Sequence, residues 1–193
     1  ATGITPPATA KNALAVGASN GSNLLPWADS GQGPLADGRI KPDVIAPGMA
    51  VCSGRAEEAR YPAGSSCGSG THTNGDPLYM SLSGTSQATA VAGGTASLVR
   101  EYIREEAGLT MPSAALVKAM LINGAKDVGA ADIPNGAEGW GHIDLDRTVR
   151  PMDGTTMLTT FLDDGPNLRA GYGLLYSFDL DPSSGIDITL SWS

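Results

Sequence analysis

A serine that follows Gly-Thr at the start of an expected helix is the residue best placed to do chemistry. Ser86 comes directly after Gly84 and Thr85, and a long run of small residues follows it. A hydroxyl on the first turn of a rigid helix can act as a nucleophile, and the unpaired N–H groups of that turn can stabilise an oxyanion. The alternative interpretation is that Ser86 or Thr85 only caps the helix, which is an ordinary role for both residue types.

The chain has two histidines that could act as a base for such a nucleophile. His72 lies in a polar stretch rich in Gly, Ser and Thr, and His142 lies within the sequence GWGHID. Histidine is the residue type whose charge changes near neutral pH. For His72 an ordinary loop role is the simpler interpretation, and for His142 we predict a structural or surface role.

The two cysteines flank a polar loop that contains several Gly and Ser residues. Cys52 and Cys67 are close in the sequence. In an exported protein this spacing suits a disulfide that closes a local loop, because disulfides persist in oxidising compartments. Two unrelated thiols are the alternative.

Short apolar runs and helical spacing predict an α/β arrangement around Ser86. Residues 13–18 (ALAVGA) and 43–46 (DVIA) have the pattern of short buried strands. The clearest helix begins after Ser86 and runs to about residue 107, and its second half places apolar side chains at helical spacing. A second helix is predicted over residues 113–125, with Pro and Ser as its start signals.

The pattern changes after Pro151. Apolar and polar residues alternate over 176–180 and 186–192, on either side of a turn at 181–185. This alternation predicts a β-hairpin with one buried face. Because an isolated hairpin is marginally stable, it implies a larger β module or a partner surface. We therefore divide the chain into an α/β part, residues 1–152, and a small all-β part, residues 153–193.

The composition excludes some classes of partner. The 193 residues include 41% hydrophobic ones, and 12 basic against 20 acidic side chains give a net charge of -8. A protein that binds nucleic acid or anionic membranes needs the opposite balance, and no apolar run reaches the ~18 residues of a membrane-spanning helix. We expect neither partner.

The two ends of the sequence are a separate feature. The N-terminal residues include neither an initiator Met nor a secretion leader, and the last residue directly follows a strand-like run. We therefore expect both ends to be cut.

Several blocks of the sequence, in the right order, resemble the subtilisin-like serine protease family (subtilases). They are residues 11–18 (KNALAVGA), the strand beside the specificity pocket; 37–48 (DGRIKPDVIAPG); 83–94 (SGTSQATAVAGG), the block around the nucleophile; 112–125, the helix that follows; and 139–145 (GWGHIDL), the closing element. The final hairpin is similar to the β-sandwich domain appended in some members. A match of several motifs in context is more specific than any single motif.

The resemblance implies an α/β fold with part of a subtilisin-like parallel sheet, flanking helices and a small all-β segment. It implies a serine endopeptidase in which Ser86 is the nucleophile and Thr85 supports the oxyanion hole. Peptide bonds of extended polypeptide substrates would be hydrolysed through an acyl-enzyme. The family also implies a secreted or periplasmic location. Some subtilases use calcium, but the acidic residues at 163–164 and at 179 and 181 are of a kind common on surfaces, so no metal ligand is assigned.

The chain departs from the family in what it lacks. The catalytic Asp and His and the oxyanion Asn of a subtilase precede the segment that matches Ala1 here. We expect them in an N-terminal half of the same protease or in another chain, and we expect this chain to be inactive alone. Two rivals are a catalytically silent fragment and a non-enzymatic interaction module built around the hairpin. A compensating role for His72 is a further alternative.

Overall fold

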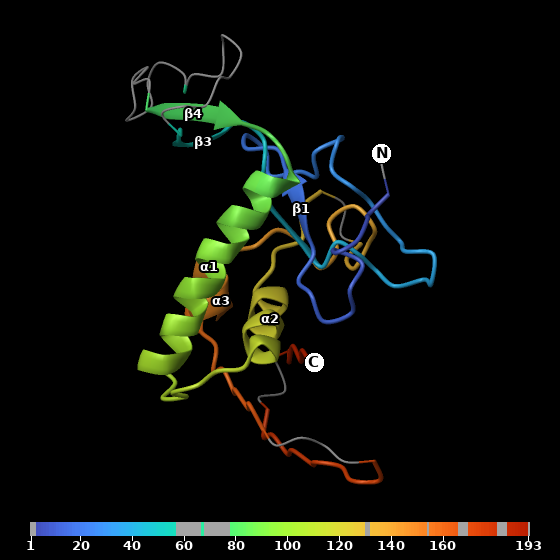
Figure 1. The fold of residues 1–193 in the computed structure, drawn as a ribbon. Helices are drawn as coiled ribbons and strands as arrows, with labels where there is room; N and C mark the ends of the chain where they lie inside the picture. Colours follow the sequence, from blue (N-terminus) through green and yellow to red (C-terminus); the bar gives the residue numbers. More distant parts are fainter. Residues whose placement is uncertain are drawn as a thin grey trace.

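The computed structural model describes residues 3–56, 67, 78–129, 132–153, 155–165, 170–180 and 185–192. Figure 1 shows the arrangement of the elements. In chain order they are β1 (Val16–Ser19), β2 (Val44–Pro47), β3 (Val51–Gly54), β4 (Tyr79–Leu82), α1 (Thr85–Glu105), α2 (Ala114–Asn123), α3 (Leu145–Val149), β5 (Met152–Asp153) and β6 (Thr156–Met157). The two predicted buried strands and both predicted helices are confirmed, with ends shifted by a few residues.

The central layer is a parallel pair of strands. β1 and β2 pair in the register Val16↔Val44 to Ser19↔Pro47. The Gly141–Ile143 backbone lies on the other edge of β2: the Ile45 N–H donates to the Gly141 carbonyl at 2.9 Å, and the Ile143 N–H donates to the Ile45 carbonyl at 2.9 Å. The closing element of the sequence therefore extends the sheet.

Helix α1 packs against this sheet through one face. Its buried side chains are Ala88 and Ala92 near the start and Val99 and Ile103 near the end. The small residues let the first turns approach the strands closely, whereas the larger ones fill the space nearer to α2. The same hydrophobic cluster includes Ala18, Val44 and Ala46 from the strands and Leu116, Met120 and Leu121 from α2.

Helix α2 begins where the sequence predicts it. The Ser113 hydroxyl accepts a hydrogen bond from the Leu116 N–H at 3.1 Å and so caps the helix. Ser113 is itself held by the distant Asp164, whose carboxylate accepts from the Ser113 N–H at 2.6 Å. Among the described residues, no helix has both the length and the apolar character needed to cross a bilayer.

An antiparallel pair leads directly into α1. β3 and β4 pair from Val51↔Leu82 to Gly54↔Tyr79, and Figure 1 shows them beyond the N-terminal end of the helix. Cys52 of β3 forms a disulfide with Cys67, with the two Cα atoms 5.7 Å apart. The predicted disulfide is confirmed. Together with the parallel strands and the helices, this pair makes a mixed α/β fold.

The predicted hairpin at 176–192 is wrong for the described residues of that stretch, none of which lies in a strand. The apolar side chains that should form its buried face are exposed; Trp192, for example, is 78% exposed. Alternation stabilises a hairpin only when one face is covered, and the described part of this chain does not cover it. β5 and β6 form a short antiparallel pair instead, and the division of the chain at residues 152–153 stays a prediction.

Candidate active site

Ser86 lies in the first turn of α1 with its side chain exposed. The N-cap of the helix is Gly84, which offers no side-chain hydrogen bond to the first turn. The capping alternative for Ser86 and Thr85 is therefore wrong, because both residues lie inside the helix. In the described part of the chain, the Ser86 hydroxyl has no hydrogen-bond partner, and Thr85 beside it is half-buried. The free hydroxyl and the open helix N-terminus lie together at the surface.

Two glycines fix the start of α1 against the sheet. The Gly84 N–H donates to the Gly48 carbonyl at 2.7 Å, and the Gly48 N–H donates to the Ser19 carbonyl at 3.1 Å. A Cβ on Gly48 would lie 2.5 Å from the Ala18 Cβ and 2.8 Å from the Gly84 oxygen. Only glycine allows this approach, so the loop after β2 and the end of β1 together set the position of the first turn.

A second anchor is formed by Ser83, the residue before the N-cap. Its hydroxyl accepts a hydrogen bond from the Ala50 N–H at 2.8 Å. Ala50 precedes β3, and Ser83 follows β4 directly. The β3–β4 pair and the Gly48 loop therefore hold the chain on both sides of the turn that leads to Ser86.

A buried charge cluster holds the entry to β1. Asp43 Oδ2 accepts from the Ala15 N–H at 2.6 Å and from Lys41 Nζ at 2.5 Å, and Asp43 Oδ1 lies 3.2 Å from Lys118 Nζ. Both lysines also donate to the Ala13 carbonyl. Since Lys118 belongs to α2, the cluster ties the strand, the loop before β2 and the second helix together.

His142 is a buried structural residue, as the sequence predicts. Its Nδ1 lies 2.8 Å from the Ile143 carbonyl oxygen and its Nε2 lies 3.1 Å from the Ser19 hydroxyl. Burial lowers the pKa of its imidazole below the ordinary value, although the Ile143 carbonyl and the Asp144 and Glu138 carboxylates act in the opposite direction. Both ring nitrogens are occupied, so His142 is not the base for Ser86. His72 lies outside the described residues.

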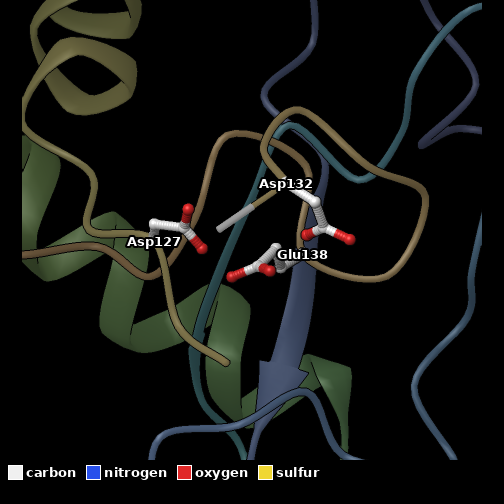
Figure 2. A group of neighbouring side chains, drawn as sticks. All are labelled: Asp127, Asp132 and Glu138. Atoms are coloured by element: carbon white, nitrogen blue, oxygen red, sulfur yellow. The ribbon is translucent and has the colours of Figure 1, made fainter. Parts of the chain in front are cut away.

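Sequence reasoning missed a group of three carboxylates in the loop between α2 and the closing element. One oxygen of each of Asp127, Asp132 and Glu138 lies within 4.8 Å of the others, and Figure 2 shows the three side chains gathered in this loop. Asn135 donates to Asp132 at 2.8 Å and to Glu138 at 3.0 Å. Hydrogen bonding of this kind is typical of a structured loop. The spacing of these acids carries no signal that separates them from ordinary loop residues.

Two of the acidic residues considered earlier as calcium ligands, Asp163 and Asp164, have protein partners. Asp164 accepts from the Ser113 N–H and hydroxyl, and Asp163 accepts from the Tyr176 hydroxyl. That hydrogen bond raises the pKa of the Tyr176 phenol. Asp181 lies outside the described residues. These contacts tie the C-terminal part of the chain to itself and to the start of α2.

Comparison with known proteins places these features in a family. The family model for subtilases, Peptidase S8, matches residues 1–141. The serine protease/ABC transporter B family protein tagA of Dictyostelium discoideum is 35% identical over an alignment of 188 residues, and the match covers 89% of this chain and 10% of tagA. The serine protease/ABC transporter B family protein tagB of the same organism is 36% identical over an alignment of 106 residues, and the match covers 50% of this chain and 5% of tagB.

Solved structures agree with this match. The CspB protease of Clostridium perfringens has a TM-score of 0.57 and 30% identity, over 75% of this chain and 27% of that protease. A lanthipeptide protease, with a TM-score of 0.58 and 24% identity over 75% of this chain and 42% of its own, supports the fold alone. The chain thus spans less than half of each relative named here. Because the family model matches most of this chain, residues 1–141 of 193, the chain belongs to the subtilase family.

Proposed function

We propose that Ser86 is the nucleophile of a serine endopeptidase that hydrolyses peptide bonds through an acyl-enzyme. The observation that carries the proposal is the exposed Ser86 hydroxyl on the first turn of α1, with no partner in the described part of the chain. Family membership supplies the reaction class. A serine held on a rigid helix, with open N–H donors beside it, has the geometry that acyl transfer needs.

The chemistry follows from this placement. The Ser86 oxygen attacks the carbonyl carbon of the scissile bond while a base takes its proton. The Ser86 N–H, supported by Thr85, donates to the developing oxyanion. The base later returns the proton to the leaving amine, and water hydrolyses the acyl-enzyme. Substrates would be polypeptides bound in an extended conformation.

The base and its orienting carboxylate would come from outside the described residues. His142 is occupied by Ser19 and Ile143, so it does not fill the role. We propose that an N-terminal half of the same protease, or another chain, supplies His, Asp and the oxyanion Asn. This chain covers 27% of the CspB protease, so the rest of that protease is long enough to include such a half. The chain alone would then be catalytically silent.

The disulfide supports a proposal on location. Cys52–Cys67 joins β3 to the loop that follows it, and disulfides of this kind persist in oxidising compartments. We propose that the protease works outside the cytosol, as a secreted or periplasmic protein. The proposal includes no cofactor.

A chimera tests the proposed function. The matching segment of the CspB protease would be replaced by residues 3–149 of this chain, and the hydrolysis of labelled casein would be measured. We expect activity in the folded chimera and its loss in Ser86→Ala. Thr89→Ala, on the same helix but one turn further along, would leave activity in place. A folded chimera that is inactive, or activity that survives Ser86→Ala, would refute the proposal.

A further inference from the structure

We propose that His142 is a positioning residue for the nucleophile, acting through Ser19 and Gly48 on the first turn of α1. The inference rests on the proposed role of Ser86. It concerns a residue far from Ser86 in the sequence, in a part of the chain that contributes no group to the proposed chemistry. Three successive hydrogen bonds join His142 to Gly84, the N-cap of α1: His142 to Ser19, Ser19 to Gly48, and Gly48 to Gly84.

A separate contact, with Ile143, fixes the proton on the ring. The Ile143 carbonyl can only accept a hydrogen bond, so Nδ1 at 2.8 Å must carry the proton. In the neutral ring, Nε2 is then an acceptor, and the Ser19 hydroxyl at 3.1 Å donates to it. His142 is 7% exposed and Ser19 is fully buried, so water cannot replace either partner without a rearrangement.

The next contacts carry the position of Ser19 to the helix. The Ser19 carbonyl accepts from the Gly48 N–H, and the Gly48 carbonyl accepts from the Gly84 N–H. Gly48 is pressed between Ala18, Gly84 and Ala88, with no room for a Cβ. Because a closely packed contact transmits a shift instead of absorbing it, a displacement of Ser19 moves Gly84 and the first turn that holds Ser86.

Protonation of His142 should therefore change the position of the first turn of α1. A protonated ring donates from both nitrogens, so the Ser19 hydroxyl would have to turn from donor to acceptor. Around the ring, the Glu138 and Asp144 carboxylates favour the charged form, whereas Lys126 and above all burial oppose it. The neutral ring keeps the contacts described above, whereas protonation in acid reverses the hydrogen bond between Nε2 and the buried Ser19 hydroxyl, so that this hydroxyl has to rotate.

A histidine that only fills space in the core is the competing explanation. Such a residue would contribute to stability, but its titration would have no specific effect at the start of α1. The two explanations differ in the amide signals of Gly84 and Ser86, which report the first turn without requiring any activity. They differ again in a variant that keeps the imidazole but lacks the Ser19 hydroxyl.

The experiment follows amide proton–nitrogen correlation spectra of this chain from about pH 7.5 to pH 4.5, across the range in which histidine titrates. His72→Gln is used as the background, so that His142 is the single histidine. We expect the Gly84 and Ser86 amides to shift with the same midpoint as the His142 ring, and Gly108, beyond the far end of α1, to stay unchanged. Gly84 and Ser86 signals that stay flat while the ring titrates would overturn the proposal.

Two variants complete the test. His142→Gln should abolish the titration at Gly84, and Ser19→Ala should do so while the ring still titrates; if His142→Gln does not fold, Ser19→Ala alone decides the matter. A Gly84 titration that persists in folded Ser19→Ala contradicts the proposal. In the CspB chimera, His142→Gln should lower kcat, by up to about 100-fold for a misplaced nucleophile, with KM unchanged. Unchanged kcat would contradict positioning, whereas a chimera inactive with His142 in place would count against the proposed function instead.

Discussion

Gly48 and Gly84 meet through their backbones, with the Gly84 N–H donating to the Gly48 carbonyl at 2.7 Å. This contact joins the loop after β2 to the N-cap of α1. Gly48 is held in turn by the Ser19 carbonyl at the end of β1. The position of Ser86 is therefore set by the ends of two parallel strands as well as by its own helix.

Substitution of Gly48 tests this contact. In Gly48→Ala the new Cβ would meet the Ala18 Cβ at 2.5 Å, so the helix start has to move, and we expect a loss of about 1–3 kcal/mol in the free energy of unfolding. Gly54→Ala is the matched control, because no atom lies within 4 Å of its Cβ position. Urea denaturation measures both. Equal stability of the two variants would show that the contact is not tight.

The buried cluster around Asp43 should dominate the polar contribution to stability. Asp43→Asn leaves the ammonium groups of Lys41 and Lys118 without an anionic partner, and removing one member of a buried ion pair lowers stability by about 3–5 kcal/mol. Asp146→Asn removes only an exposed pair with Arg150, so we expect little change there. If both variants unfold at the same urea concentration, the Asp43 cluster contributes no more to stability than an exposed ion pair does.

The buried imidazole makes stability depend on pH in a defined direction. The pKa of His142 is lowered from 6.5 in the folded chain, so the unfolded chain binds more protons between that lowered pKa and 6.5. The free energy of unfolding should therefore fall as the pH drops below 6.5 and level off below the folded pKa. Denaturation measured at several pH values should show this slope in His72→Gln. A slope of the same size in folded His142→Gln would contradict the assignment to His142.

Reduction of the disulfide should lower the melting temperature. Cys52 and Cys67 are separated by 15 residues, and a closed loop of that length contributes about 3 kcal/mol in the loop-entropy model. Melting curves with and without dithiothreitol measure the effect. The double variant Cys52→Ala, Cys67→Ala should melt at the lower temperature in both conditions. An oxidised protein that melts no higher than the double variant would contradict the prediction.

The sequence was sufficient for the elements around Ser86 because their patterns are local. The runs at 13–18 and 43–46, the long helix and the start signals at residues 112–113 each depend on neighbouring residues. The partner of His142 was not predictable, since Ser19 lies 123 positions away. The prediction of a hairpin at 176–192 was wrong for a related reason. Alternation shows which face of a strand is apolar, but it does not show whether anything covers that face.

The labelling of Ser86 by a fluorophosphonate probe tests the central claim most directly. The probe reacts with a serine only when a base activates it. We predict no adduct on this chain alone, and one adduct, mapped to Ser86 by peptide mass spectrometry, on the CspB chimera, in which the CspB protease supplies the N-terminal half. The Ser86→Ala chimera should give none. A folded chimera that stays unlabelled, or an adduct at a serine other than Ser86, would contradict the claim that this chain carries the nucleophile of a subtilase.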